Sequence, residues 1–177
     1  MEVLQGRPTD ETGRLEKEIA VYDLLDKLDI PFRRVDHVHA DTMEMCQEID
    51  QALGQDICKN LFLCNRQKTK FYLLLMPGDK PFKTKDLSAQ IGSSRLSFGG
   101  AEDMERLLNL TPGSVTVLGL MYDPDCQVTL LIDQDLYQQS AFGCHPCINT
   151  STVQFSTADF REKLIPALGH PVTLVQL

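Results

Sequence analysis

The sequence predicts an α+β fold, with a mixed but largely antiparallel sheet flanked by helices, and three observations support this prediction. Helical and strand-like hydrophobic patterns intermix along the chain without regular β-α-β alternation. Two of the strand-like segments are joined by a short polar turn, which is typical of an antiparallel hairpin. No internal repeat, low-complexity tract or long linker divides the 177 residues. We therefore expect a single domain over residues 1–177.

The first third of the chain predicts two helices and a strand. Apolar residues recur on one stripe over residues 15–28, which indicates an amphipathic helix. Residues 32–35 can form a short strand. Asp41 and Glu44 have the spacing of a capping box, so we expect a second helix to begin there and to end near Gly54.

The middle of the chain predicts the hairpin and two further helices. Residues 61–64 and 70–76 are strand-like and enclose the polar turn 65–69. Thr84 can cap a helix that ends near residue 92. A pair of glycines then precedes a helix over residues 101–108.

The last third of the chain predicts three extended segments, a helix and a final strand. Residues 127–132 form a strongly apolar strand pattern, and residues 144–149 and 151–155 also look extended. Ser156, with Asp159 three residues later, starts a helix whose inner face carries Phe160, Leu164 and Leu168. Residues 172–177 can add a strand.

Composition and charge limit the classes of function. Hydrophobic residues make up 42% of the chain and charged residues 24%, which is ordinary for a globular protein. The chain has no apolar run of membrane-spanning length and no export signal near Met1, so we expect a cytoplasmic protein with reduced cysteines and no membrane partner. The net charge is −8, yet residues 57–100 hold eight basic and two acidic side chains. This distribution excludes a protein that coats nucleic acid and suits a polyanion bound at one patch. A lysine-rich sheet edge would give the same pattern.

Cys144 and Cys147 have the spacing of a zinc knuckle or a redox pair. A structural zinc site needs four ligands, and only Cys126, His37 and His39 remain to complete one. A thioredoxin-like pair should open a helix, whereas this segment looks extended. We therefore expect no metal and no cofactor, and we keep a zinc or thiol-redox protein as an alternative.

Three other features carry possible chemistry, and each has a structural explanation as well. Lys59 precedes a buried strand, where a lysine either faces a cleft or extends its ammonium to solvent. Residues 113–117 follow a proline turn and can present backbone N–H groups to an oxygen. His145 can exchange protons near neutral pH, although a core histidine with a backbone partner is the commoner case.

These weak signals belong to a series of motifs in a fixed order. The series is Lys59-Asn60-Leu61-Phe62-Leu63, Leu75-Met76-Pro77-Gly78-Asp79-Lys80, Arg95-Leu96-Ser97-Phe98, Leu110-Thr111-Pro112-Gly113-Ser114-Val115-Thr116, and His145-Pro146 with Asn149-Thr150. It resembles the freestanding relatives of the prolyl-tRNA synthetase editing domain, the YbaK-like superfamily, and within it the trans-acting Ala-tRNA(Pro) deacylases. The resemblance covers nearly the whole chain.

The resemblance implies an enzyme that hydrolyses the ester between a mischarged amino acid and the terminal adenosine of tRNA, here Ala-tRNA(Pro). Lys59 would hold the terminal phosphate or ribose region. Asn60 and His145 would line the catalytic pocket. The reason for such an enzyme is physical: a synthetase pocket shaped for proline cannot strongly reject alanine, because missing methylenes discriminate by only about 1–3 kcal/mol.

The resemblance also assigns roles to the remaining motifs. The Gly113-Ser114 loop would meet the ester carbonyl, with Val115 and Thr116 as further substrate contacts. Asn149 and Thr150 would support the pocket wall. The family loop commonly runs Gly-x-x-x-Pro, and here Val117 stands at the proline position.

Partners and alternatives follow from the same resemblance. The expected partner is mischarged tRNA, with prolyl-tRNA synthetase as a further candidate and no DNA. Lys68 and Lys70 belong to the basic segment that would meet acceptor-stem phosphates. Either His145 or a ribose hydroxyl of the substrate would activate the water, and we assign His145 to positioning first. The alternatives are a deacylase for Cys-tRNA(Pro) or Ser-tRNA, and a tRNA-binding module without catalysis.

Overall fold

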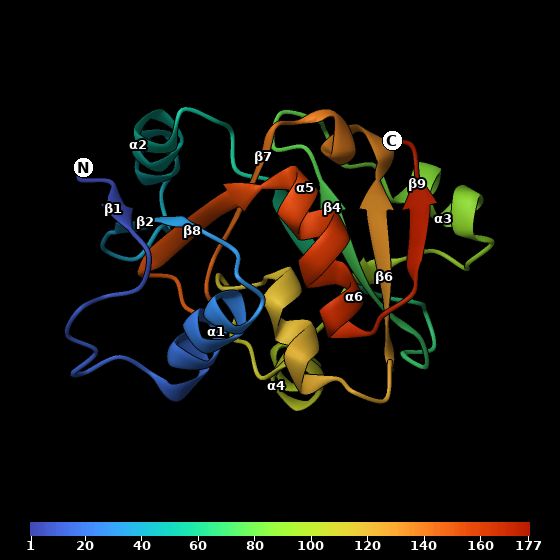
Figure 1. Ribbon diagram of the computed structural model, residues 1–177. Helices are drawn as coiled ribbons and strands as arrows, with labels where there is room; N and C mark the ends of the chain where they lie inside the picture. The colour runs from blue at the N-terminus through green and yellow to red at the C-terminus, as the bar shows by residue number, and fades with distance from the viewer.

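The strands divide between two sheets in the computed structural model, which describes residues 1–177 (Figure 1). The four-stranded sheet has the order β1-β2-β8-β7, and all its pairings are antiparallel. Its strands are β1 (Leu4–Gln5), β2 (Arg33–Asp36), β7 (Ala141–Cys144) and β8 (Ser151–Ser156).

The five-stranded sheet has the order β5-β3-β4-β6-β9. Its strands are β3 (Lys59–Cys64), β4 (Phe71–Met76), β5 (Ser97–Phe98), β6 (Val128–Asp133) and β9 (Val172–Val175). The β3–β4 hairpin and the β3–β5 pair are antiparallel, whereas β4, β6 and β9 run parallel. Five of the seven pairings are thus antiparallel, and the predicted α+β class is confirmed.

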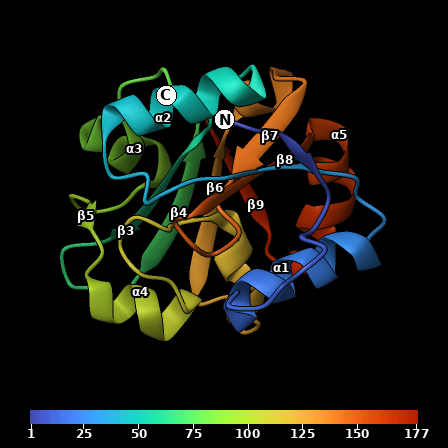
Figure 2. The same ribbon diagram turned by 90° about the vertical axis from the view of Figure 1, so that its left-hand side faces the viewer.

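The longer helices lie at the ends and sides of the sheets. They are α1 (Glu16–Lys27), α2 (Met43–Leu53), α3 (Thr84–Ile91) and α4 (Ala101–Leu108). Figure 2 shows α1 and α4 at one end of the molecule and α2 at the other. None of the helices combines the length and the apolar character that crossing a bilayer requires.

The remaining helical segments are short. Two 3-10 helices are η1 (Val117–Tyr122) and η2 (Gln134–Gln138), and the C-terminal helix consists of α5 (Thr157–Asp159), η3 (Phe160–Leu164) and α6 (Ile165–Leu168). η3 is a π-helical turn. Pro166, which follows it, has no N–H for the i−4 bond of a regular α-helix.

The main core lies between the two sheets. β4 is buried along its whole length, and its residues alternate between two apolar clusters, as expected for a strand covered on both faces. Leu73 and Leu75 join the large cluster, together with Phe142 of β7 and Phe155 of β8. Leu74 joins the second cluster, which α3 covers. The large cluster therefore fixes the two sheets relative to each other.

Three local predictions need correction. Thr84 does not cap α3, because it is the first residue of that helix, and the N-cap residue Lys83 makes no side-chain cap hydrogen bond. Residues 144–149 are not one extended segment, because β7 ends at Cys144 and the chain turns at Cys147, whose φ is +64°. The side chain of Thr42, rather than Asp41, caps α2 by accepting from the Met45 N–H at 3.2 Å. Ser156 caps the last helix as predicted, accepting from the Asp159 N–H.

Candidate functional site

A small cavity of about 240 Å³ lies where β3 begins and β7 ends. It is lined by Ile57, Cys58, Asn60, Gly113, Val115, Cys144 and His145. The fold thus brings together four of the predicted site residues from three distant parts of the chain. We call this space the small cavity.

The loop over residues 111–116 alternates between the small cavity and the protein interior. Gly113 and Val115 line the cavity, whereas Ser114 and Thr116 are buried on the other side. The Ser114 hydroxyl and amide both donate to the Thr111 carbonyl, at 2.8 and 3.0 Å. The amides of Gly113 and Val115 have no acceptor within the protein. Two N–H groups therefore remain available to an oxygen of a ligand.

The side chain of Asn60 presents an unpartnered oxygen beside the small cavity. Its Nδ2 donates to the carbonyl of Cys58 at 3.3 Å and to the Cys58 sulfur at 3.4 Å. Its Oδ1 is buried and has no hydrogen-bond partner. An orphaned buried oxygen costs about 1–3 kcal/mol, so its presence at a cavity indicates a site for a ligand donor.

Lys59 lies outside the small cavity, because successive residues of a strand face opposite sides. Its ammonium donates to the backbone carbonyl of Lys80. Lys80 itself contacts Asp133 at 3.0 Å and Asp135 at 2.6 Å. These ion pairs hold Lys80, whereas Lys59 keeps donors for a further partner.

The imidazole of His145 is half-buried and is oriented by the backbone of Ser151. Its Nδ1 lies 2.9 Å from the carbonyl oxygen of Ser151, which makes Nδ1 the protonated nitrogen and leaves Nε2 as an acceptor. Burial lowers the pKa of His145, and nearby His37 lowers it further, against the opposing effect of the Ser151 carbonyl. His145 is therefore a neutral hydrogen-bond acceptor at pH 7.

Two residues that sequence reasoning did not assign to this site form a bridge to His145. The hydroxyl of Thr152 lies 2.9 Å from Nε2 of His37 and 3.4 Å from Nδ1 of His145. The two rings are 6.1 Å apart. In the sequence, the only signal for this bridge is that His37 follows a short strand. That position does not indicate that His37 contacts a residue of β8.

The cysteines of the small cavity are neutral wall residues. Burial raises the pKa of Cys144 to about 12 and also raises that of Cys58. Because the thiolate is the reactive form, these thiols have little nucleophilic character. All six cysteines are free, and no group of three or more His, Cys, Asp or Glu side chains is arranged to hold a metal ion.

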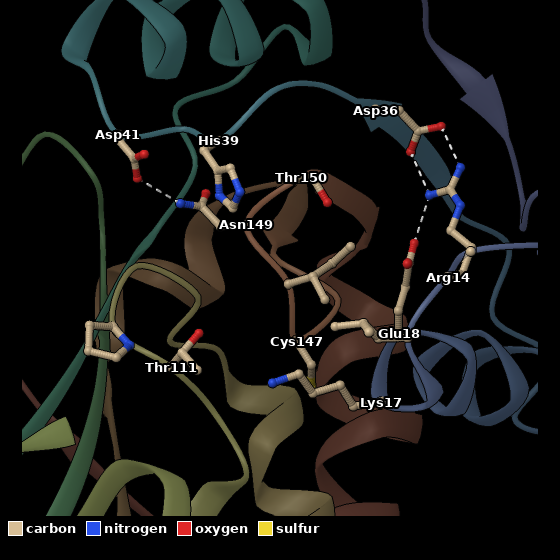
Figure 3. Close-up of a pocket in the computed structure, with 14 residues that line it drawn as sticks. Arg14, Lys17, Glu18, Asp36, His39, Asp41, Thr111, Cys147, Asn149 and Thr150 are labelled. Carbon is tan, nitrogen blue, oxygen red and sulfur yellow. Dashed lines mark hydrogen bonds and ion pairs between the residues drawn. The ribbon is translucent and has the colours of Figure 1, made fainter. Parts of the chain in front are cut away.

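Asn149 and Thr150 lie at a second cavity of about 610 Å³, which we call the large cavity (Figure 3). Asn149 accepts from the Ala40 amide at 3.1 Å and donates to Asp41 at 3.0 Å. The backbone carbonyl of Thr150 accepts from the His37 amide at 3.0 Å. Both residues thus join the 145–150 loop to residues 37–41.

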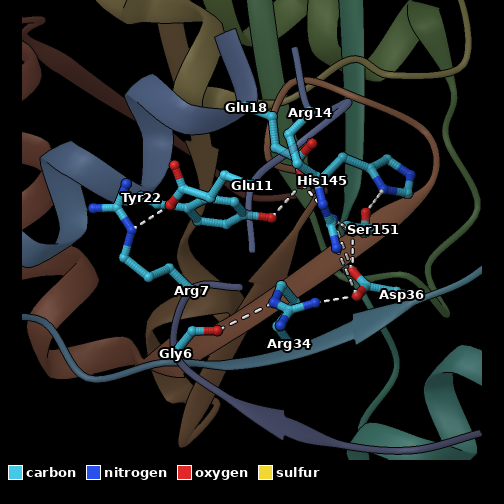
Figure 4. A network of polar contacts seen from close by, with 10 residues as sticks. All are labelled: Gly6, Arg7, Glu11, Arg14, Glu18, Tyr22, Arg34, Asp36, His145 and Ser151. Atoms are coloured by element: carbon cyan, nitrogen blue, oxygen red, sulfur yellow. Dashed lines mark hydrogen bonds and ion pairs between the residues drawn. The ribbon is translucent and has the colours of Figure 1, made fainter. Parts of the chain in front are cut away.

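A partly buried polar network supports the strands that orient His145 (Figure 4). Arg14 donates to Glu18 at 2.8 Å and to Asp36 at 3.0 Å. Asp36 also accepts a hydrogen bond from the Ser151 hydroxyl, and the Ser151 carbonyl accepts a hydrogen bond from Nδ1 of His145. Burial alone would raise the pKa of Asp36, but hydrogen bonds from its partners, first that from Arg14, hold it well below its usual range. The network therefore ties α1, β2 and β8 together directly behind the site.

Lys68 and Lys70 lie apart from both cavities. They are exposed on and after the turn between β3 and β4, at the opposite end of β3 from Asn60. Neither forms an ion pair within the protein.

Comparison with known proteins places this geometry in a family. The family model for the aminoacyl-tRNA editing domain matches residues 37–163. The prolyl-tRNA editing protein ProX of Acetoanaerobium sticklandii is 31% identical over 163 residues, which are 92% of this chain and 99% of the relative. Prolyl-tRNA synthetase associated domain-containing protein 1 of Danio rerio is 28% identical, over 90% of this chain and 86% of that protein.

A solved structure shares the fold. The crystal structure of a proposed trans-editing enzyme for prolyl tRNA synthetase has a TM-score of 0.66 at 16% identity, covering 92% of this chain and 98% of that one. The family model matches most of the chain and includes the residues of the small cavity. The protein therefore belongs to the aminoacyl-tRNA editing domain family.

Proposed function

We propose that the protein is a trans-editing deacylase that hydrolyses the ester of Ala-tRNA(Pro). The observation that carries this proposal is the set of unsatisfied polar groups at the small cavity. The Asn60 oxygen lacks a donor, and the amides of Gly113 and Val115 lack acceptors. An aminoacyl ester supplies both complements on adjacent carbons, an ammonium group on Cα and a carbonyl oxygen on the ester carbon.

The size and polarity of the small cavity support alanine as the amino acid. Its volume of about 240 Å³ lies below the usual range for ligand pockets. Ile57, Cys58, Val115 and Cys144 give it apolar walls, and these walls offer a methyl group contact without a hydrogen bond. A serine hydroxyl would be desolvated there without a partner, which disfavours Ser-tRNA. Cysteine remains the competing substrate.

The proposed reaction needs a positioned water and stabilisation of negative charge. Water would attack the ester carbonyl and pass one proton to the vicinal ribose hydroxyl, which would relay its own proton to the ester oxygen as the bond from that oxygen to the carbonyl carbon breaks. The released alanine would then lose the second proton of the water from its carboxyl group to solvent and leave as a carboxylate. The Gly113 and Val115 amides would stabilise the oxyanion. Nε2 of His145 would accept a hydrogen bond from the water or from the vicinal ribose hydroxyl. The substrate hydroxyl, held in this way, would serve as the proton acceptor.

The tRNA would approach along the basic segment of the chain. Lys59 would hold the phosphate or ribose at the acceptor end, and Lys68 and Lys70 would meet phosphates farther along the acceptor stem. Ser114 and Thr116 would fix the conformation of the 111–116 loop. Asn149 and Thr150 would support the neighbouring 145–150 loop. We place the reaction in the cytoplasm, with the whole chain as one editing domain and prolyl-tRNA synthetase as a candidate partner.

The decisive assay measures deacylation of tRNA(Pro) charged with alanine, cysteine or proline. We expect rapid release of alanine, slower release of cysteine and no release of proline above the uncatalysed rate. Asn60→Ala should lower kcat/KM for Ala-tRNA(Pro) by about 10–100-fold, because it removes the ammonium acceptor.

The control is Gln47→Ala, an exposed position on α2 away from both cavities, which should leave the rate unchanged. Hydrolysis of Pro-tRNA(Pro) at the rate of Ala-tRNA(Pro) would contradict the size argument. A protein that binds the tRNA but releases no amino acid would be a binding module instead.

A further inference from the structure

The apolar wall of the small cavity depends on the position of one side chain, that of Ile57. This residue lines the cavity and comes directly before the buried Cys58. Its side chain also packs against a small apolar cluster of Val35, Ile49 and Leu53, between α2 and β2. Ile57 therefore separates the space proposed for the amino acid from this part of the core.

The backbone of Ile57 is held on both of its polar groups. Its amide donates to Oδ1 of Asp50 at 3.0 Å. Its carbonyl lies against Gly78, where an added Cβ atom would be 2.4 Å from the carbonyl oxygen. A group that pressed on the side chain of Ile57 would therefore rotate that side chain rather than shift the backbone.

Gly143 of β7 leaves room for the tip of Ile57. It is buried, and a Cβ atom at its position would lie 2.4 Å from Cδ1 of Ile57 and 3.7 Å from Cγ1. The first distance is far below van der Waals contact, so a side chain at position 143 requires Ile57 to move. The φ of Gly143 lies outside the left-handed region, so the backbone itself would accept alanine. The glycine is thus needed for its neighbour and not for the strand.

Hydrogen bonds hold Gly143 in place beside Ile57. Gly143 lies opposite Gln154 in the antiparallel pairing of β7 with β8. Its carbonyl accepts from the Cys58 sulfur at 3.5 Å, and that sulfur accepts from Nδ2 of Asn60 at 3.4 Å. With the core on one side and β7 on the other, the small cavity is the open space into which Ile57 can turn.

We infer that Gly143 sets the depth of the small cavity by keeping Ile57 out of it, and so determines which amino acid the enzyme accepts. This inference rests on the proposed function. Gly143 does not line the cavity, so it is a positioning residue that acts through Ile57. A methyl group at position 143 would turn Ile57 into the space meant for the methyl group of alanine and leave room for glycine alone.

The test is a double-mutant cycle, measured by release of glycine, alanine and cysteine from charged tRNA(Pro). Gly143→Ala should lower kcat/KM for alanine at least about tenfold but that for glycine less than about threefold, because glycine needs no side-chain space. Ile57→Val lacks the Cδ1 atom that meets the added Cβ, so the double variant should recover alanine release to within about threefold of wild type. Alone, Ile57→Val widens the cavity and should raise cysteine release relative to alanine.

Gly100→Ala is the matched control for the added methyl group. Gly100 is exposed, lines neither cavity and has nothing near an added Cβ. Its variant should keep the wild-type ratio of alanine to glycine release. Ile57→Val should have the same effect in the Gly100→Ala background as in the wild-type protein, because the two sites share no contact.

Urea unfolding separates this inference from the proposed function, because it measures the contact without any tRNA. Ile57→Val should lower the unfolding midpoint less in the Gly143→Ala background than in the wild-type protein. Equal losses of alanine and glycine release in Gly143→Ala, or no recovery in the double variant, would overturn the inference while alanine release by the wild-type protein still stands. A wild-type protein that releases no alanine, with the coupling in unfolding intact, would instead overturn the proposed function and with it the assigned selectivity.

Discussion

At the scale of single residues, the environment of His145 fixes both its tautomer and its charge. The Ser151 carbonyl accepts a hydrogen bond from Nδ1–H, and burial lowers the pKa of the ring. Nε2 is then an acceptor over the whole neutral range. The role proposed for His145, holding a water or a hydroxyl group, requires this state.

The pH dependence of deacylation tests the neutral state of His145. Because its pKa is lowered from 6.5, the wild-type rate, corrected for uncatalysed hydrolysis, should be level near pH 7 and fall only at clearly more acidic pH. His145→Ala should lower kcat at pH 7 by at least about tenfold and remove this acidic decline. An identical decline in the variant would assign the titration to another group.

Protonation of His145 also lowers the stability of the folded protein. A histidine whose pKa is lower in the folded than in the unfolded state favours folding only while it stays neutral, so its contribution is complete above about pH 6.5 and is lost as the pH falls below it. The acidic decline in rate must therefore be measured at a temperature at which the protein remains folded.

Residue patterns predicted part of this site. Asn60, Gly113, Val115 and His145 meet at the small cavity, as the motif series implied. Lys59 lies on the side of β3 that faces away from the small cavity. This placement follows from the alternation of side chains along a strand, which the sequence already contains. The bridge from Thr152 to His145 could not be predicted, because it depends on the register between β2 and β8.

At the scale of elements, the conformation and packing of the 111–116 loop depend on one glycine. Gly113 has a φ of +92°, in a region that side chains strongly disfavour, and it faces Asn149 at close range. The loop therefore needs glycine both for its backbone conformation and for its contact with the neighbouring loop.

Gly113→Ala should disturb this loop, and Gly100→Ala provides the matched control. The Gly113 variant should lose about 1–2 kcal/mol of unfolding free energy and at least about tenfold in deacylation rate. Gly100, the N-cap residue of α4, has a φ of −75° and nothing near its added Cβ, so its variant should keep the deacylation rate and lose only the small free energy of replacing an N-cap glycine by alanine. Denaturant unfolding and the alanine-release assay measure the two quantities, and equal behaviour of the variants would contradict the role of Gly113.

Elements with a strong local pattern could be predicted from the sequence. β4 and the C-terminal helix have enough apolar residues, at the right spacing, to define their type and approximate limits. The start of α2 could not be placed as well, because Asp41 is engaged by Asn149, a residue 108 positions away. Because this distant contact engages Asp41, Thr42 caps α2 instead.

At the scale of the whole molecule, the charge is unevenly distributed along the chain. Residues 57–100 contain eight basic side chains, and the flanking segments are acidic. Lys80 is held by Asp133 and Asp135, but Lys68 and Lys70 remain exposed and unpaired. These two lysines are therefore available to a polyanion.

Charge reversal at Lys68 and Lys70 tests this surface. The double variant Lys68→Glu and Lys70→Glu should weaken tRNA binding at least about tenfold and reduce the slope of log affinity against log salt concentration by about 1–2. Lys27→Glu, an exposed lysine of the acidic N-terminal part, is the control and should change neither. Filter binding over a salt series measures both, and equal slopes for the two variants would rule out the proposed contacts.

The division into two sheets was beyond what the sequence could predict. The hairpin of β3 and β4 is local, and its turn is visible in the sequence. The pairing of β2 with β8, by contrast, depends on side chains such as Asp36 and Ser151, which are 115 residues apart. Such pairings depend on the packing of the complete core.

The pairing of β2 with β8 also sets the order in which the protein can assemble. The ribosome synthesises β2 long before β8, so the edge of β2 that pairs with β8 stays open through most of the synthesis of the chain. His145 and the backbone that orients it are synthesised only shortly before or together with β8. A prematurely terminated chain would therefore keep this edge open and be prone to aggregate, and it would lack the complete site around His145.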